Sequence, residues 1–288
     1  MLRLRVPYVE FYITNVCNLA CPGCNRFNNY EFRGYQRWQD YADIYQQWAQ
    51  EIEPSTLGIL GGEPLLTPDA MAWIQGVSAL WPGKFCKVVT NGFYLNRVRG
   101  LYDFLAAHPN VEIWLGIHNK THKPRIMREI ETFLVGPLQH EFNDTNRYQQ
   151  SLVITDSAGV RIKVEYNWWF HQGALIRGPD GFRLHESDPE RAHANCHMRT
   201  CHHFIRGKLY KCGVVALLPE FAQQFPMLLD PDDRALMQAY RPLSLEDDFD
   251  TKSAFVTGLD DPIAQCRFCP EVYHGDQIFA LEKRELKS

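Results

Sequence analysis

Segments with strand periodicity alternate with segments of helical periodicity through about residue 185, and this alternation limits the fold more than any other feature. We predict strands at 8–14, 56–60, 85–89, 111–117, 151–154 and 160–166. We predict helices at 38–52, 98–107 and 123–134, and a further helix with Thr67 as N-cap and Pro68 in its first position. Such alternation predicts an α/β fold with a parallel sheet and crossover helices, either open or a partial barrel.

Small and polar residues directly follow four of these strands. The four loops are the cysteine loop at 17–24, Gly61-Gly62-Glu63-Pro64, Thr90-Asn91-Gly92 and Gly116-Ile117-His118-Asn119. Because the carboxyl ends of parallel strands meet at one edge of a sheet, binding sites form there. We therefore expect the four loops to line one site.

The composition is that of an ordinary folded protein, with 45% apolar residues, 22% charged residues and a net charge of −4. This balance predicts no nucleic-acid partner and no attraction to an anionic membrane. No apolar run of about 18 residues occurs, and the N-terminal stretch has the pattern of a strand rather than of a signal peptide. We therefore expect a cytoplasmic protein, whose nine cysteines are thiols and whose clustered cysteines are metal ligands.

Cys17, Cys21 and Cys24 form a C-x3-C-x2-C triplet directly after the first predicted strand. Thiolates are the usual ligands of iron–sulfur clusters, and close spacing lets one loop wrap the metal. Three cysteines leave one iron of a [4Fe-4S] cluster open to a small chelating molecule. The alternative is a zinc knuckle, for which a fourth protein ligand would be needed.

The triplet, together with Gly61-Gly62-Glu63-Pro64 after the next strand, resembles the radical S-adenosylmethionine (SAM) superfamily. The resemblance implies a partial (β/α)6 TIM-like barrel in residues 1–187, with SAM bound through its methionine group to the open iron. It implies that the backbone of Gly61, Gly62 and Pro64 and the Glu63 side chain hold the SAM amino group. Thr90 and Asn91 would line the SAM pocket.

Two positions depart from the family pattern. Gly23 stands where the family often has an aromatic residue that packs against SAM. His118 or Asn119 occupies the place of a serine near the SAM ribose, and either could replace that contact or simply lie in an exposed loop.

Cysteines become dense after residue 187, where the alternating pattern ends. They are Cys196, Cys201, Cys212, Cys266 and Cys269. Residues 201–212 predict a β-hairpin with Arg206-Gly207 at its turn, which would place Cys201 opposite Cys212. Cys86, by contrast, lies inside an apolar strand and is expected to be an inert core thiol.

The stretch 188–288 resembles the auxiliary-cluster extension of radical SAM enzymes in its short Twitch form, related to the longer SPASM form. The resemblance implies a small cysteine-rich β-hairpin plus helix extension with a second [4Fe-4S] cluster. A four-cysteine site needs Cys196 or Cys201 but not both; the family spacing favours Cys196 and the hairpin favours Cys201. A structural zinc site made of the same cysteines is the alternative.

These resemblances imply an enzyme that cleaves SAM reductively to a 5′-deoxyadenosyl radical and abstracts a substrate hydrogen atom. A small electron donor such as flavodoxin or ferredoxin would supply the electron. The expected outcome is oxidation or cross-linking of a peptide or small molecule, with the second cluster as electron acceptor. Trp168, Trp169 and Phe170 could wall a substrate pocket or pack in the core. A non-catalytic iron–sulfur electron carrier and a zinc-stabilised binding protein are the alternatives.

Overall fold

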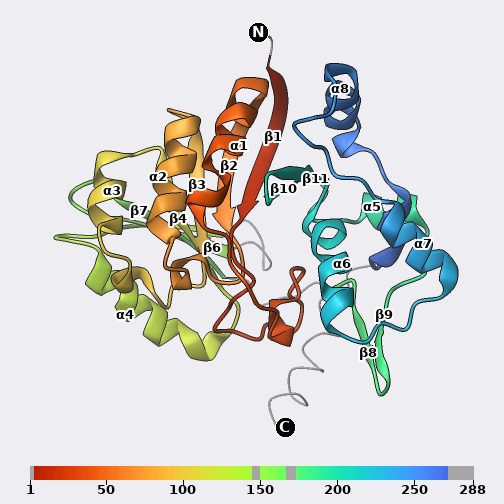
Figure 1. The fold of residues 1–288 in the computed structure, drawn as a ribbon. Helices are drawn as coiled ribbons and strands as arrows, with labels where there is room; N and C mark the ends of the chain where they lie inside the picture. Colours follow the sequence, from red (N-terminus) through yellow and green to blue (C-terminus); the bar gives the residue numbers. More distant parts are fainter. Residues whose placement is uncertain (1–2, 145–149, 167–172, 272–288) are drawn as a thin grey trace.

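A nine-stranded sheet organises the computed structural model, which describes residues 3–144, 150–166 and 173–271 (Figure 1). The strand order is β11-β10-β1-β2-β3-β4-β7-β6-β5. The strands are β1 Leu4–Tyr12, β2 Ile52–Leu60, β3 Phe85–Thr90, β4 Val111–Ile117, β5 Gln139–Asp144, β6 Gln150–Thr155, β7 Arg161–Tyr166, β10 His202–Ile205 and β11 Lys208–Tyr210. Within it, the run β10-β1-β2-β3-β4-β7 is parallel throughout.

Four crossover helices connect the strands of the first half. They are α1 Trp38–Glu51, α2 Ala70–Leu80, α3 Leu101–Ala107 and α4 Lys123–Phe133. The second half contains α5 Pro189–Ala194, α6 Gly213–Gln224, α7 Pro231–Ala239, α8 Phe249–Thr257 and a separate hairpin of β8 Ile176–Gly178 and β9 Gly181–Arg183. Short 3-10 helices are η1 Asn28–Tyr30, η2 Pro64–Leu66, η3 Leu95–Arg97, η4 Lys120–His122, η5 Gly258–Asp260 and η6 Ala264–Phe268.

The predicted alternation is confirmed as far as α4 and is wrong beyond it. The predicted strand at 111–117 has the bounds of β4, and the other early elements differ by a few residues at their ends. After α4, however, the chain forms the antiparallel hairpin β5–β6, and β6 pairs antiparallel with β7. The reason is that parallel neighbours need a crossover, whereas these three strands follow one another through short connections.

The predicted start of α2 at Thr67 is also wrong. Residues 64–66 form η2, and the Thr67 amide closes that turn on the Pro64 carbonyl at 3.2 Å. The α-helix therefore begins only at Ala70, with Asp69 in the N-cap position. Glu63 is the N-cap of η2, and its side chain accepts a hydrogen bond from the Leu65 amide.

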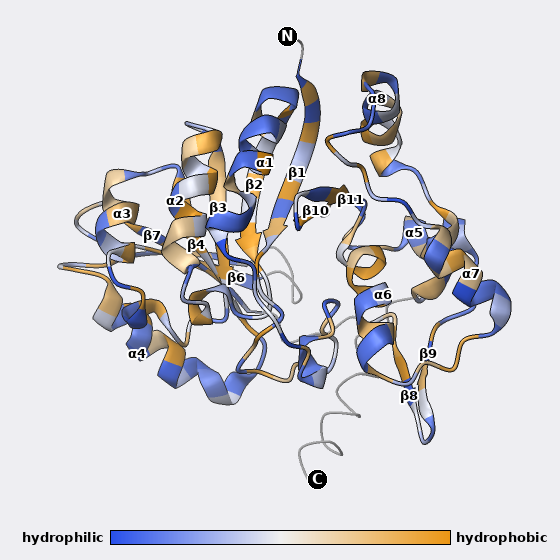
Figure 2. Ribbon diagram, in the orientation of Figure 1, coloured by the Kyte–Doolittle hydropathy of each residue, from blue (hydrophilic) through white to orange (hydrophobic). Residues whose placement is uncertain are grey.

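The main core lies between the sheet and its covering helices. Phe11 of β1 contacts Tyr45, Trp73, Trp81 and Phe204 through ring centroids 5.1–6.3 Å apart. Figure 2 shows the same division, with hydrophobic residues on the central strands and mostly hydrophilic residues on the outer sides of α1 and α4. This packing leaves the other face of the sheet available for polar side chains.

The hairpin predicted at 201–212 is confirmed. β10 and β11 pair antiparallel with Ile205 opposite Lys208, and Arg206 and Gly207 at the turn have φ of 50° and 75°. β10 also pairs with β1 in parallel, so this hairpin extends the main sheet. The division of the chain at 187/188 and the partial barrel stay predictions.

No helix in the described part of the chain is long and apolar enough to cross a membrane. Trp168, Trp169 and Phe170 lie outside the described residues.

Candidate functional site

The cysteine loop lies against the Gly61-Gly62 turn that follows β2. The Gly62 amide donates to the Thr14 carbonyl at 2.7 Å, and the Glu63 amide donates to the Val16 carbonyl at 2.7 Å. A Cβ atom on Gly62 would stand only 2.3 Å from the Val16 oxygen. Glycine is therefore required here because two backbone segments meet without room for a side chain.

The three cysteines of this loop line one cavity of about 380 Å³. Gly61, Gly62, Thr90, Asn91, Gly116 and His118 line the same cavity, so all four predicted loops contribute to it. The cavity lies at the carboxyl ends of β1 to β4, as expected for a parallel sheet. We call Cys17, Cys21 and Cys24 the first site.

Short contacts fold the cysteine loop around this cavity. The Cys24 amide donates to the Cys21 carbonyl at 3.1 Å, and the Leu19 amide lies 3.4 Å from Cys17 Sγ. Burial raises the pKa of the Cys17 thiol to about 11. Backbone donors that point at a thiol sulfur suit an anionic, metal-bound thiolate.

Glu63 lies behind the cavity wall and is fully buried. Its Oε1 accepts from the Thr90 hydroxyl at 2.6 Å and from the Leu65 amide at 3.0 Å, while Oε2 accepts from the Asn91 amide at 2.7 Å. Burial raises the pKa of this carboxyl to about 7, against these hydrogen bonds, which lower it. The carboxylate thus ties the β2 turn to the β3 turn.

Asn91 reaches from the β3 turn to the cysteine loop. Its Nδ2 donates to Asn18 Oδ1 at 2.8 Å and lies 3.9 Å from Cys17 Sγ. His118 lines the cavity, whereas the Asn119 side chain accepts from the Thr121 amide at 2.9 Å and caps η4. Of the two residues considered for the ribose contact, His118 therefore has the better position.

Trp114 and Glu165 form the cavity wall on β4 and β7. The Trp114 ring lies between two ammonium groups, with Lys87 Nζ 3.8 Å and Lys163 Nζ 3.9 Å from its centroid. Lys163 also pairs with Glu165 at 3.0 Å. Sequence reasoning missed Trp114, although its register beside the loop residue Gly116 on an alternating strand was the available signal.

A buried charge network lies beneath the cysteine loop. Arg26 pairs with Glu10 of β1 at 2.8 Å, and His203 Nε2 of β10 lies 3.0 Å from the same carboxylate oxygen. Burial raises the pKa of Glu10, but the positive charges of Arg26 and His203 outweigh it and hold this pKa at about 2. The first site is thereby tied to the hairpin that carries Cys201 and Cys212.

A second bridge joins the cysteine loop to the region of Cys196. Asn25 Nδ2 lies 3.0 Å from His197 Nε2 and 2.9 Å from the sulfur of Met198. His197 itself lines the cavity of the first site. The C-terminal cysteine region therefore borders this cavity directly.

Four of the later cysteines affect one another electrostatically. Burial raises the pKa of Cys269 well above its usual value, and the neighbouring charges of Cys212, Cys196 and Cys266 raise it further. Burial likewise raises the pKa of Cys212 to about 11, again with contributions from Cys196 and Cys266. We call Cys196, Cys212, Cys266 and Cys269 the second site.

Cys201 has different neighbours. Burial raises its pKa to about 12, and the strongest neighbouring charges are those of Glu10 and Arg26. Among the cysteines, Cys196 also raises this pKa. The hairpin register pairs His203 with Tyr210, and extending it by two residues would put Cys201 opposite Cys212, so the choice between Cys196 and Cys201 stays a prediction.

Within residues 3–144, 150–166 and 173–271, no three His, Cys, Asp or Glu side chains converge closely enough to ligate one metal ion. A four-iron cluster is larger than a single ion, so its thiolate ligands surround a wider space. The thiol-only donor sets of both sites are those that iron–sulfur clusters use.

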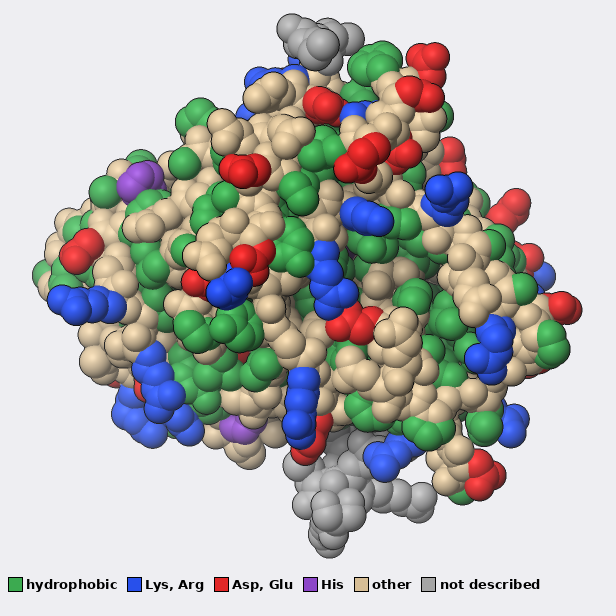
Figure 3. All heavy atoms as spheres, in the orientation of Figure 1, with side chains coloured by type: hydrophobic (Ala, Val, Ile, Leu, Met, Phe, Trp, Pro, Cys, Tyr) green, Lys and Arg blue, Asp and Glu red, His purple; other side chains and the backbone are tan. Residues whose placement is uncertain are grey.

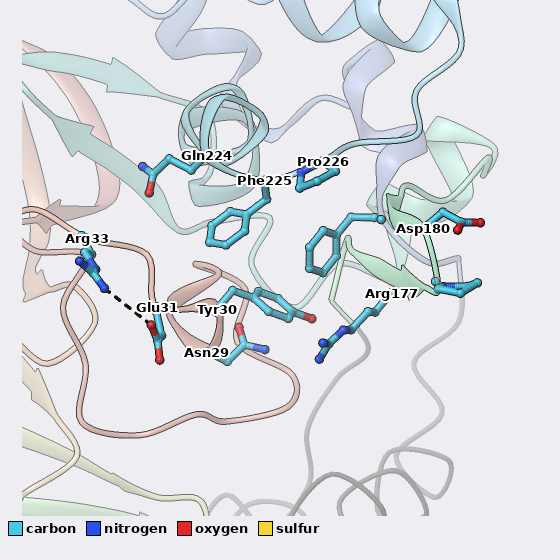
Figure 4. A pocket seen from close by; sticks show the side chains of 13 residues that line it. Asn29, Tyr30, Glu31, Arg33, Arg177, Asp180, Gln224, Phe225 and Pro226 are labelled. Carbon is cyan, nitrogen blue, oxygen red and sulfur yellow. Dashed lines mark ion pairs between the residues drawn. The ribbon is translucent and has the colours of Figure 1, made fainter. Parts of the chain in front are cut away.

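A larger open cavity of about 750 Å³ lies away from both sites (Figure 4). Tyr30 and Phe225 face it, and Arg33 at its edge pairs with Glu31 at 3.8 Å. No cysteine lines this cavity. Size therefore does not identify the reactive site in this protein.

Comparison with known proteins gives short similarities, and no family model matches the chain. GTP 3′,8-cyclase of Nautilia profundicola is 23% identical over 95 residues, which are 32% of this chain and 30% of that protein. The match is a partial similarity over less than a third of each protein.

Among solved structures, Streptococcus suis SuiB bound to S-adenosylmethionine is 22% identical over 41% of this chain and 27% of that chain, with a TM-score of 0.34. SuiB bound to precursor peptide SuiA is 20% identical over 44% of this chain and 30% of that chain, with a TM-score of 0.37. Native anSMEcpe with bound AdoMet and Cp18Cys peptide is 17% identical over 46% of this chain and 40% of that chain, with a TM-score of 0.34. The chain thus spans less than half of each of these proteins.

Proposed function

We propose that this chain is a radical SAM enzyme whose first site holds a [4Fe-4S] cluster. The observation that carries the proposal is the single cavity lined by Cys17, Cys21 and Cys24, the Gly61-Gly62 turn and Asn91. Three thiolates leave one iron for the methionine group of SAM, and the bound cofactors supply reductive cleavage to a 5′-deoxyadenosyl radical that abstracts a substrate hydrogen.

The protein's own residues position these groups. The Gly61-Gly62 backbone offers close approach, and Glu63 fixes the turns that carry Thr90 and Asn91 at distances of 2.6 and 2.7 Å. His118 lies on the cavity wall for a polar contact with the ribose. Trp114 and Glu165 line the β4–β7 side of the cavity, where a substrate would enter beside SAM.

The second site would hold an auxiliary [4Fe-4S] cluster in a Twitch-like extension, residues 188–288, next to a partial TIM-like barrel in residues 1–187. The mutual charge effects of Cys196, Cys212, Cys266 and Cys269 support this set over one with Cys201. Four thiolates would leave no open iron, which suits electron transfer. His197 on the cavity wall, next to Cys196, gives this site a short connection to the substrate.

The substrate that we propose is a peptide or small molecule that loses a hydrogen atom and then an electron. If the second cluster accepts that electron, the net reaction is an oxidation such as a dehydrogenation or a cross-link. The radical SAM enzymes with this extension often modify peptides, so a peptide is the first class to assay.

The test is anaerobic reconstitution, followed by iron counting and measurement of 5′-deoxyadenosine made from SAM and reductant. We expect about eight irons per chain and catalytic 5′-deoxyadenosine formation. Replacing Cys17, Cys21 and Cys24 together by Ala should remove about four irons and all SAM cleavage. Cys86→Ala, which removes a fully buried thiol of β3, is the matched control and should keep both.

Zinc without iron in the purified protein would favour a zinc-stabilised binding protein and contradict the proposal. Full iron loading without any SAM cleavage would instead leave a non-catalytic electron carrier.

A further inference from the structure

A cationic surface lies beside the first site on a protein whose net charge is −4. It consists of exposed residues from the segment around η3 and from η4 and α4: Arg97, Arg99, Lys120, Lys123, Arg125 and Arg128. Figure 3 shows Lys and Arg side chains gathered at the lower left, where Figure 1 places α4. Neither 93–100 nor 119–128 contains an acidic residue, so the excess of positive charge is local and strong.

The two segments form one continuous surface. Asn96 Nδ2 donates to the Glu129 carbonyl and to Glu129 Oε2, both at 2.9 Å, and so holds η3 beside α4. Arg97, Arg99, Arg125 and Arg128 form no ion pair with any residue in the described ranges.

Lys123 and Arg125 lie in the first turn of α4, where a helix more often carries acidic residues. The helix begins at Lys123 and has no acidic residue in its first turn. Cations there oppose the helix dipole. Residues that break a local stability rule in this way are expected where function requires them.

The cationic surface is also connected to the first site within a few residues. Asn91, 3.9 Å from Cys17 Sγ, accepts a hydrogen bond from the Phe93 amide at 3.2 Å through its side-chain oxygen. The guanidinium of Arg125 stands 4.6 Å from the Phe93 ring centroid, and His122 packs against the same ring at 5.2 Å. A partner on this surface would therefore approach the cysteine loop from the Asn91 side.

We propose that the cationic surface docks a small acidic redox protein that delivers the electron needed at the first site. This inference rests on the proposed function and names its electron donor by charge complementarity. One electron leaves the donor's flavin or iron–sulfur group, which is oxidised by one electron, and the cluster of the first site is reduced by it. No bond forms or breaks in this step, and docking sets its rate.

The experiment compares two reductants in the reconstituted enzyme: reduced flavodoxin, a small acidic protein, and reduced methyl viologen, a small cation that needs no docking surface. The patch variant is Arg97→Glu, Arg99→Glu and Arg128→Glu. The matched control is Arg183→Glu, Arg234→Glu and Arg241→Glu, which makes the same total charge change at exposed positions elsewhere.

At low ionic strength we expect flavodoxin-driven 5′-deoxyadenosine formation to fall at least about tenfold in the patch variant, because electrostatic steering is lost. The control should retain most of the wild-type rate, and all three proteins should be equally active with methyl viologen. Added salt should slow the flavodoxin-driven wild-type reaction and leave the patch variant nearly unchanged.

Equal flavodoxin-driven rates in the patch variant and the wild type would overturn the inference. Equal rates are also the result expected if the surface binds an acidic peptide substrate instead of the electron donor. An equal loss in the control would also overturn it, because total charge would then be the cause. If methyl viologen gives no 5′-deoxyadenosine in any of the three proteins, the proposed function itself has failed.

Discussion

Glu10 is the side chain on which the two cysteine regions converge. Arg26, two residues after Cys24, and His203, two residues after Cys201, both contact one of its carboxylate oxygens. His203 also lies against the backbone after Cys212, since a Cβ on Gly213 would stand 3.1 Å from His203 Nε2. One buried carboxylate therefore helps to fix the distance between the first and second sites.

Glu10→Gln should lower the free energy of unfolding by about 3 kcal/mol at pH 7, because it leaves Arg26 without its anionic partner. The folded-state pKa of Glu10, about 2, lies below the ordinary value of 4.5. Its stabilisation is therefore present above pH 4.5 and is lost as the pH falls toward 2. Urea unfolding of the metal-free protein should show the difference between variant and wild type narrowing as the pH is lowered through this range.

Glu31→Gln is the control for that series, since Glu31 is 90% exposed in its pairing with Arg33. It should change stability by less than about 0.5 kcal/mol at any pH tested. A difference between Glu10→Gln and wild type that stays constant down to pH 3 would show that charge is not the cause.

Glu63→Gln replaces one accepting oxygen by an NH2 group facing backbone and hydroxyl donors. With Thr90, Leu65 and Asn91 all donating to the carboxylate, at least one donor would lose its partner. We expect a loss of about 1–3 kcal/mol in the free energy of unfolding, measured by urea titration without iron. Thr90→Val, which removes one donor and leaves the carboxylate, should cost less; the opposite order would contradict the role assigned to Glu63.

Local spacing made the cysteines and the Gly-Gly-Glu-Pro turn identifiable from the sequence. The Glu10, Arg26 and His203 network was not, because Arg26 and His203 are 177 residues apart in the chain and Glu10 lies still farther from His203, so that they meet only through strand pairing. Glu63 shows a second limit. The sequence indicated a carboxylate at the site, but only the fold shows that its oxygens accept from the protein's own donors.

At the scale of elements, the contact between the β2 turn and the cysteine loop decides whether the first site can form. The β10–β11 hairpin was predictable because Arg206-Gly207 has the residue pattern of a tight turn. The strand predicted at 151–154 lies within β6, but β5 and the antiparallel pairing were not predicted, since a short strand pattern does not state the direction of its neighbour.

Gly62→Ala should prevent the cysteine loop from closing, because the added Cβ would lie 2.3 Å from the Val16 oxygen. We expect loss of about four irons from the first site with the second site still loaded, measured by iron and sulfide analysis after reconstitution. Gly173→Ala, with no atom within 4 Å of the added Cβ, should load like the wild type. Full loading of Gly62→Ala would refute the role given to this backbone contact.

At the scale of the molecule, the sheet itself brings the two halves of the chain together. β10 from the C-terminal half pairs with β1, and the second hydrophobic core joins Phe27 and Phe32 of the cysteine-loop region to Phe221 of α6. The sequence predicted two regions with one cluster each. It could not predict that they share a sheet, because the pattern of a hairpin does not state which other strand its edge pairs with.

The assignment of the second site leads to a whole-molecule prediction. Cys196→Ala should remove about four irons and leave SAM cleavage by the first site intact, because Cys196 is a charge neighbour of Cys212, Cys266 and Cys269. Cys201→Ala should keep all irons, since its neighbours are Glu10 and Arg26. Iron counting on both variants makes the distinction, and loss of iron in Cys201→Ala alone would reverse the ligand assignment.

The central claim is that the cysteine loop leaves one iron open for SAM, and electron paramagnetic resonance of the reduced protein tests it most directly. The spectrum should be recorded with and without SAM in Cys196→Ala, where the cluster of the first site is the signal. We predict a clear change in g-values when SAM is added, and no such signal at all in a variant that also lacks Cys17, Cys21 and Cys24. A reduced-cluster spectrum that saturating SAM leaves unchanged would contradict the account.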